Sequence, residues 1–172
     1  MRADSFIVND LPRYLIQEWY NLNIYNESDM QCCAYFWLRD YFDTERSTKW
    51  IIRTQPTTPL DRGGKYKPDI SIFRNSVLYD AIELKCQLDG IGGTVFDKDI
   101  EKFHVLKTEY NLRHAYQLVL YDDERVLKFP SYSKEDWMKD YLTLVPANVR
   151  YHPSGRKRNN YQMARKKWEK FR

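Results

Sequence analysis

The chain has 172 residues, of which 42% are hydrophobic and 16% aromatic, and its net charge is +4 at pH 7. This length and apolar content predict one folded domain that is large enough to bury a core. The three cysteines, an odd count with two of them adjacent, indicate reduced intracellular thiols rather than a disulfide framework or a zinc site. No apolar run reaches membrane-spanning length and the N-terminus has no secretory leader, so we expect a soluble protein of the cytoplasm.

Positive charge is concentrated at the C-terminal end. Residues 147–172 hold nine Lys or Arg and one Glu, a net charge of +8, which leaves −4 for residues 1–146. We therefore expect a domain at 1–146 and a basic arm at 147–172 that meets phosphate, an interpretation favoured by its interleaved aromatic residues. The alternative is a solvated terminus. The candidate nucleic-acid contacts of the arm are Arg156, Lys157, Arg158, Arg165, Lys166 and Lys167.

Two helices are expected near the N-terminus. Asp10 is a candidate N-cap, with Pro12 in the first turn of a helix that ends near Tyr20. Asn26 can cap a second helix that ends near Phe42.

Glu27 lies at the edge of the buried face of this second helix. It is either a first-turn acid favoured by the helix dipole or a catalytic residue. Glu18 on the first helix is a rival for the catalytic role.

A short strand is expected at residues 49–54, followed by a loop that contains two adjacent glycines. Arg62, Lys65 and Lys67 make this loop basic. It could track a nucleic-acid backbone, or it could be an ordinary connection.

The stretch from Lys67 to Gln87 predicts a β-hairpin. Two runs rich in β-forming residues flank a turn at Asn75 and Ser76. Because side chains alternate along a strand, one face of the second run is expected to be core and the other to carry charge. The core face would hold Leu78, Ile82 and Leu84, and the other face Ala81, Glu83 and Lys85. Antiparallel pairing about this turn would bring Asp69 close to Glu83, a patch that suits a divalent metal.

The remaining chain supplies a crossover helix and a buried strand. The glycines of residues 89–99 match no nucleotide-binding fingerprint and indicate a mobile loop. A helix is expected from about Val95 to Leu112, then a strand at 114–123. A short edge strand at Val126–Phe129 and a helix at 133–142, capped by Ser133, would follow. This order predicts an α/β fold with a mixed central β-sheet flanked by helices.

The pair Pro68-Asp69, followed after thirteen residues by Glu83-Leu84-Lys85, resembles the PD-(D/E)XK nuclease superfamily. The resemblance lies in motif and element order and covers roughly residues 26–122. It implies a restriction-endonuclease-like fold in which an acidic helix precedes a mixed sheet with the catalytic hairpin at its centre.

The resemblance also implies roles for four side chains. Asp69 and Glu83 would be the metal carboxylates, Lys85 the catalytic lysine, and Glu27 the acid of the first helix. Carboxylates are hard oxygen ligands that suit Mg²⁺, for which Mn²⁺ can substitute, and the backbone carbonyl of Leu84 is a further candidate ligand. Lys85 would either orient the attacking water or deprotonate it. The alternative is that Glu83 and Lys85 form a salt bridge at a strand edge and have no catalytic role.

We therefore expect a Mg²⁺-dependent DNA endonuclease that holds DNA with its basic arm, and a homodimer would set two sites on opposite strands. The alternatives are a nuclease-fold DNA-binding module without catalysis, an exonuclease, an RNA-directed nuclease and a protein-interaction scaffold. A thiol hydrolase built on Cys86 with His104 or His114 is a further alternative, although by alternation Cys86 is expected to face the core.

Overall fold

The computed structural model describes residues 3–44, 49–55, 58–59, 65–88, 96–122, 140–151 and 158–171. The helices are α1 (Ala3–Ser5), the π-helix η1 (Phe6–Asp10), α2 (Leu11–Tyr20), α3 (Glu27–Asp43), α4 (Phe96–Tyr110) and α6 (Arg158–Phe171). The strands are β1 (Trp50–Thr54), β2 (Thr58–Pro59), β3 (Lys65–Tyr66), β4 (Ile70–Arg74), β5 (Val77–Gln87), β6 (His114–Tyr121) and β7 (Leu142–Asn148).

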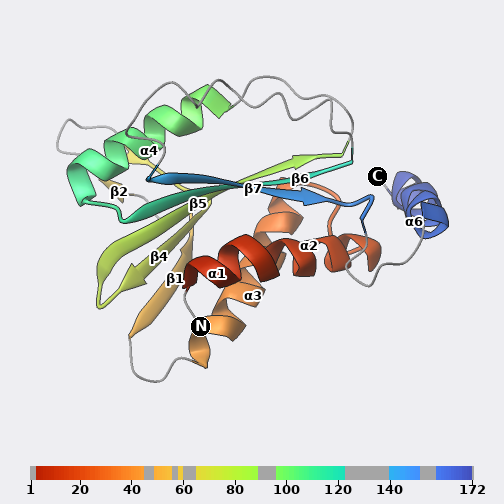
Figure 1. Ribbon diagram of the computed structural model, residues 1–172, viewed down its shortest axis with the longest axis horizontal. Coiled ribbons are helices and arrows are strands. Elements are labelled where there is room, and N and C mark those ends of the chain that lie inside the picture. The colour runs from red at the N-terminus through yellow and green to blue at the C-terminus, as the bar shows by residue number, and fades with distance from the viewer. Residues whose placement is uncertain are drawn as a thin grey trace.

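Five strands form one mixed sheet in the order β1-β4-β5-β6-β7 (Figure 1). The pairs β1–β4 and β4–β5 are antiparallel, whereas β5–β6 and β6–β7 are parallel. The short strands β2 and β3 pair separately. The expected mixed central sheet flanked by helices is therefore confirmed, with β5 at its centre.

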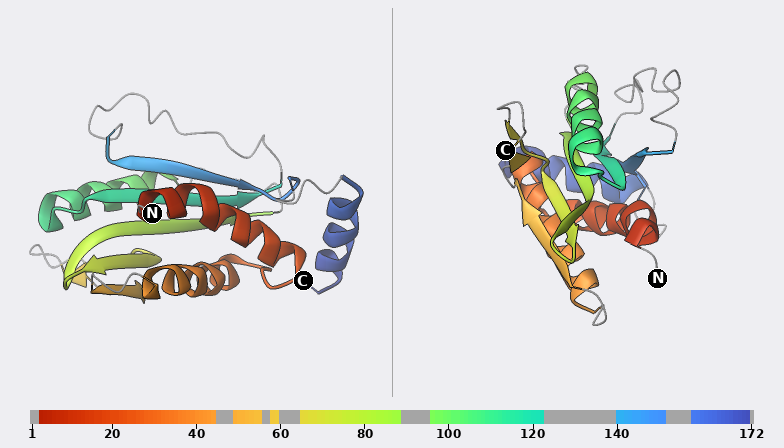
Figure 2. Two further views of the ribbon diagram at one scale, coloured as in Figure 1. Left: turned by 60° about the horizontal axis from the view of Figure 1, so that its bottom comes forward. Right: turned by 90° about the vertical axis from the view of Figure 1, so that its left-hand side faces the viewer.

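Helices cover both faces of the sheet (Figure 2). On one face α2 packs against β6 and β7, and α3 packs against β1 and β5. On the other face α4 packs against β5. The basic helix α6 stands beyond the end of the sheet at which β5, β6 and β7 terminate (Figure 1). No helix in the described ranges combines the length and apolar character needed to span a membrane.

The predicted hairpin is confirmed and its turn is tight. Arg74 pairs with Val77, so only Asn75 and Ser76 connect the strands. Both have positive φ, 50° and 68°, as a type I′ turn requires, and this turn matches the twist of the flanking strands. Asn tolerates this backbone region well, which explains why these residues can set the register of the two strands.

One face assignment was wrong, because a β-bulge interrupts the alternation of β5. Ile72 pairs with Asp80 but Phe73 pairs with Leu78, so Tyr79 is an extra residue in β5. Leu78 consequently lies with Ala81 in the cluster under α4, while Ile82 and Leu84 face α2 and α3. The rest of the predicted alternation holds.

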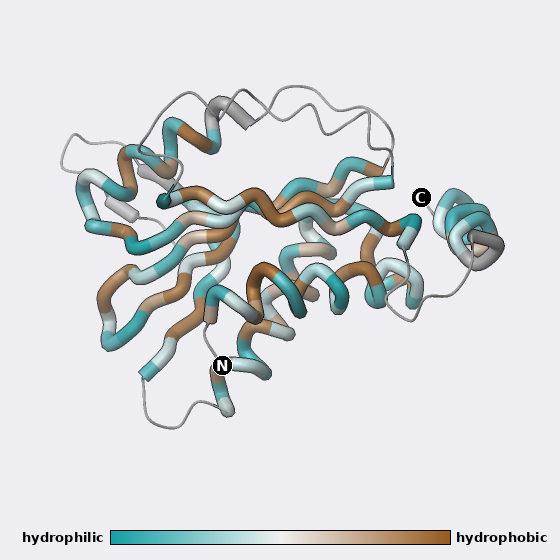
Figure 3. Tube along the Cα trace, viewed as in Figure 1, coloured by the Kyte–Doolittle hydropathy of each residue, from teal (hydrophilic) through white to brown (hydrophobic). Residues whose placement is uncertain are grey.

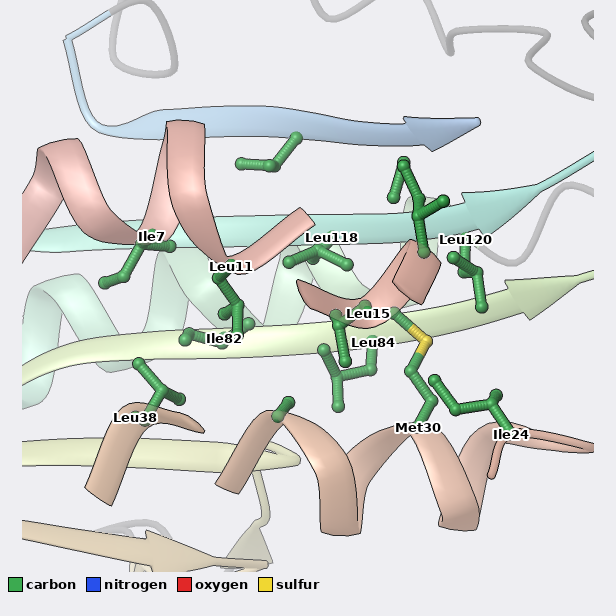
Figure 4. Packing of buried hydrophobic residues seen from close by; sticks show 14 of the residues in the cluster. Ile7, Leu11, Leu15, Ile24, Met30, Leu38, Ile82, Leu84, Leu118 and Leu120 are labelled. Atoms are coloured by element: carbon green, nitrogen blue, oxygen red, sulfur yellow. The ribbon is translucent and has the colours of Figure 1, made fainter. Parts of the chain in front are cut away.

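The larger core lies between the sheet and the N-terminal helices. Hydrophobic residues run along the central strands, whereas α6 is mostly hydrophilic (Figure 3). Side chains from η1, α2 and α3 interlock with those of β5 and β6, as Figure 4 shows. The residues labelled there are Ile7, Leu11, Leu15, Ile24, Met30, Leu38, Ile82, Leu84, Leu118 and Leu120.

Asp80, the residue after the bulge, is linked to the N-terminal segment through Arg113. Its buried carboxylate accepts hydrogen bonds from the Arg113 guanidinium at 3.2 and 3.1 Å. Arg113 also binds Asp4, whose carboxylate accepts a 2.7 Å hydrogen bond from the Tyr116 hydroxyl. This cluster ties α1 to the end of the sheet at which β6 begins.

The first helix starts earlier than predicted. The backbone is helical from Ala3, through η1, into α2, and Asp10 makes no side-chain cap. Pro12 fits the first turn of α2 as expected. The second prediction is confirmed, since the Asn26 side chain accepts a 3.0 Å hydrogen bond from the Asp29 amide at the start of α3.

Two elements near the C-terminus were not predicted. Residue 142, placed at the end of a helix by the sequence, lies in β7. Residues 147 and 148, the expected start of the basic arm, also belong to β7, and residues 158–171 form α6. The expected strand at 126–129 and most of the expected helix at 133–142 lie outside the described residues.

The docking of α6 can be tested through Trp168, which is 1% exposed and belongs to the larger core. We expect Trp168→Ala to lower the free energy of unfolding by about 3–5 kcal/mol, because it empties a large buried site. Lys170→Ala, at an exposed position of the same helix, should change it by less than about 0.5 kcal/mol. Urea denaturation measures both; equal small effects would show that α6 is not docked.

Candidate active site

The candidate site lies where β5 extends beyond the last residue of β4 that pairs with it. The ladder between β4 and β5 ends at the pair Ile70–Ile82, so Asp69 stands opposite Glu83 just beyond it. The Oδ2 atom of Asp69 accepts a 2.8 Å hydrogen bond from the Leu84 amide. The carboxylate therefore satisfies the backbone donor that a longer β4 would have paired, and this fixes Asp69 beside Glu83.

The backbone of Asp69 is held by two further donors. Its carbonyl oxygen accepts a 2.6 Å hydrogen bond from Gln31 Nε2 and a 2.9 Å bond from the Gln55 amide. Gln31 lies one helical turn after Glu27, so α3 presents both residues on one face. The helix thus positions Asp69 and contributes Glu27 to the same region.

An alternating chain of charges links the site residues. Lys102 Nζ lies 2.6 Å from Glu83 Oε1 and 3.4 Å from Asp99 Oδ1. Lys85 Nζ lies 3.2 Å from Asp99 Oδ2 and 3.9 Å from Glu27 Oε1. Gln117 Nε2 donates a 3.3 Å hydrogen bond to Asp99 Oδ2. Side chains from α3, α4, β5 and β6 therefore converge on the hairpin.

Glu83 is the most strongly perturbed acid of this cluster. It is 2% exposed, and burial together with the nearby Asp69 carboxylate raises its pKa to about 8 despite the opposing effect of Lys102. The main cause of this raised pKa is burial, which disfavours the charged carboxylate, and the negative charge of Asp69 adds to it. Perturbation of this kind is common at functional sites.

Lys85 remains a cation in this environment. Burial alone would lower its pKa, but the carboxylates of Asp99, Glu27 and Glu83 together raise it. Burial raises the pKa of Glu27, and Lys85 opposes that rise. A raised pKa suits Lys85 to stabilise negative charge and disfavours its use as a general base.

Positive charge would complement this cluster. It contains four carboxylates and two ammonium groups, which leaves two negative charges in excess when all are ionised. The groups are Glu27, Asp69, Glu83, Asp99, Lys85 and Lys102. Within the described ranges no three acidic, histidine or cysteine side chains are grouped to hold a metal ion. The two facing carboxylates, supplemented by a backbone carbonyl and water, still fit Mg²⁺, which keeps several waters when it binds proteins.

The candidate nucleic-acid contacts differ in their environments. Lys67, Lys166 and Lys167 are exposed, whereas Arg165 is engaged with Asp122 and Glu169. Arg62, Arg156 and Lys157 lie outside the described residues, as do the side chains of Lys65 and Arg158.

The thiol alternative receives no geometric support from Cys86 and His114. Cys86 packs against the larger core, on the face of β5 that α2 and α3 cover, as alternation predicted. His114 Nε2 lies 2.7 Å from Thr143 Oγ1, at the opposite end of the paired strands.

Sequence reasoning assigned no role to four residues that contact the candidate site residues: Gln31, Asp99, Lys102 and Gln117. The available signals were local. Gln31 follows Glu27 by four residues on a helix, and Asp99 and Lys102 are separated by three residues on α4. No local signal marks Gln117, because its role depends on the parallel pairing of β6 with β5, in which it is the partner of Glu83.

The raised pKa of Glu83 predicts a pH-dependent stability. Its folded pKa of about 8 lies above the ordinary value of 4.5, so its protonation stabilises the fold at low pH and this contribution is lost as pH rises toward 8. Glu83→Gln has no carboxyl group to ionise at this position, so its stability does not fall for this reason as pH rises. In EDTA, we expect the variant to gain stability relative to the wild type between pH 5 and 8, by at most about 1.4 kcal/mol per pH unit. Urea denaturation at each pH measures the difference, and a constant difference would contradict a raised pKa.

The chain was compared with models of known protein families and with curated proteins. No family model matches it, and no curated protein matches it either. The residues of this chain and their geometry are therefore the basis for the function proposed below.

Proposed function

We propose that the protein is a Mg²⁺-dependent endonuclease that hydrolyses phosphodiester bonds in DNA. One observation carries this proposal: the hairpin register sets Asp69 opposite Glu83, with Lys85 two residues further along the same face of β5. Two carboxylates with a lysine beside them form the donor set that metal-assisted phosphodiester hydrolysis needs. The mixed sheet with this hairpin at its centre is consistent with the resemblance to PD-(D/E)XK nucleases.

Asp69, Glu83 and the Leu84 carbonyl would hold Mg²⁺, and Mn²⁺ can take its place. The cation would neutralise the charge that develops on the phosphate. For Glu83 to serve as a ligand, it must lose its proton and its 2.6 Å contact with Lys102 must loosen. Asp99 lies 3.4 Å from the same ammonium group and can retain it.

Lys85 would stabilise negative charge on the scissile phosphate and orient the attacking water. Its ammonium group is held by Asp99 at 3.2 Å and faces Glu27 at 3.9 Å. Glu27 is half-exposed, so it can contact water that enters the site. The cationic Lys85 thus acts by its charge, and Glu27 supports its position.

A second candidate function is a DNA-binding module that keeps this fold without cleaving. The observation that favours it is the 2.6 Å hydrogen bond from Lys102 to Glu83, which supplies Glu83 with a protein partner in place of a metal. The two functions differ in whether Mg²⁺ binds and whether DNA is cut.

Metal binding should be visible in stability. We expect Mg²⁺ or Mn²⁺ to raise the thermal unfolding midpoint of the wild type, because a ligand that binds only the folded state stabilises it. Asp69→Asn, which keeps an oxygen for the Leu84 amide but loses the charge, should show a much smaller rise. Differential scanning calorimetry against EDTA measures this, and equal rises in both proteins would place the metal elsewhere.

Cleavage tests the reaction itself. We expect the wild type to cut supercoiled, linear or branched DNA with Mg²⁺ but not with EDTA. Lys85→Ala should cut at least about 10²-fold more slowly, because it removes a group that stabilises transition-state charge. Lys49→Ala, an exposed lysine next to β1, is the matched control and should cut at the wild-type rate.

DNA binding without cleavage under either metal would favour the binding module and overturn the enzyme proposal. Cleavage of RNA but not of DNA would move the substrate to RNA. If the protein has no affinity for nucleic acid at low salt, both proposed functions fall and a protein-interaction scaffold is favoured.

A further inference from the structure

The basic helix α6 is fixed to the domain by several specific contacts. Trp168 is buried, and its Nε1 donates a 3.0 Å hydrogen bond to the Ile24 carbonyl. The Arg165 guanidinium donates to the Leu88 carbonyl and, at 3.0 Å, to Asp122 Oδ2. Tyr161 donates a 3.0 Å hydrogen bond to the same Asp122 oxygen. These contacts fix the orientation of α6, so the face of the helix that points away from the domain has a defined position.

These anchors place α6 next to the candidate active site. Ile24 precedes Glu27 by three residues, and Leu88 follows Lys85 by three. Asp122 directly follows β6, at the end of the sheet beyond which α6 stands (Figure 1). A nucleic-acid strand bound along α6 would therefore pass close to the end of β5 that carries Glu83 and Lys85.

The charge of α6 is directed outward. Arg165 is neutralised by Asp122 and by Glu169 at 2.9 Å, so it serves the docking of the helix. Lys166, Lys167 and Lys170 are exposed and form no ion pair with another described residue. Lys166 and Lys170 lie one turn apart, so their ammonium groups extend from the same side of the helix.

We propose that this lysine face, Lys166, Lys167 and Lys170, binds the phosphodiester backbone of the nucleic acid that the site cleaves. The inference rests on the proposed function and names the surface that holds its substrate. Charge complementarity argues for this partner, since lysine ammonium groups on a fixed helix match a row of phosphates. Contacts of this kind position the strand without reading its sequence.

The test is the triple variant Lys166→Gln, Lys167→Gln, Lys170→Gln, studied in EDTA so that no cleavage occurs. Fluorescence anisotropy with a short labelled duplex measures affinity over a range of salt concentrations. Three lost phosphate contacts should reduce the slope of log affinity against log salt by about 2.7 and weaken binding on the order of 10²-fold at 0.1 M salt. Unchanged affinity and slope would overturn the proposal.

A matched control separates a local surface from overall charge. Arg13→Gln, Lys49→Gln, Arg53→Gln removes three charges at exposed positions on α2 and around β1. This control should bind nearly as tightly as the wild type. An equal loss in both triple variants would show that only net charge matters and would also overturn the proposal.

Two further measurements separate this inference from the proposed function. Hydrolysis of bis(p-nitrophenyl) phosphate with Mg²⁺ needs no extended backbone, so the α6 variant should retain the wild-type rate. If the wild type hydrolyses nothing but the α6 variant still weakens duplex binding, the surface stands and the enzyme proposal falls. If the variant loses binding to phosphatidylserine vesicles while its duplex binding is unchanged, the partner is a lipid surface and the nucleic-acid surface is refuted.

Discussion

The hydrogen bond from the Leu84 amide to the Asp69 carboxylate is the contact on which the candidate site depends. It forms because the paired part of β4 ends at Ile70, two residues short of the position opposite Leu84, so a side-chain oxygen takes the place of a backbone carbonyl. The two-residue turn at Asn75 and Ser76 fixes where that end falls. A shift of one residue would turn every side chain of a strand to the opposite face. The turn therefore sets the register of the ladder, and the register sets which side chains meet at the site.

The consequence of this constraint is a crowded, negatively charged patch at the centre of the sheet. Asp69 is fixed beside the buried Glu83, and the protein offsets their repulsion with Lys102 and with a raised pKa at Glu83. Neither device removes the excess of negative charge. A divalent cation would offset this excess, and this is the reason for proposing that the site holds a metal ion.

Local patterns predicted much of the fold, and contacts distant in sequence account for what they missed. The hairpin, the cap at Asn26 and the crossover helix were predictable, because each depends on neighbouring residues. The bulge at Tyr79 was not, since an extra residue leaves no mark in a β-rich run. The burial of Trp168 was also missed, because a basic segment gives no sign that one of its faces docks against residues as distant in sequence as Ile24. For the same reason Asp69, Glu83 and Lys85 could be named from sequence, whereas the positions of Asp99 and Gln117 depend on tertiary packing.

We propose that Asp69 and Glu83 together hold a divalent cation. Crystals soaked in Mn²⁺ and measured at the manganese absorption edge test it most directly. The account predicts an anomalous peak within bonding distance of both carboxylates and of the Leu84 carbonyl, with Lys102 withdrawn from Glu83 toward Asp99. A structure with no such peak, in which Lys102 still lies against Glu83, would contradict it.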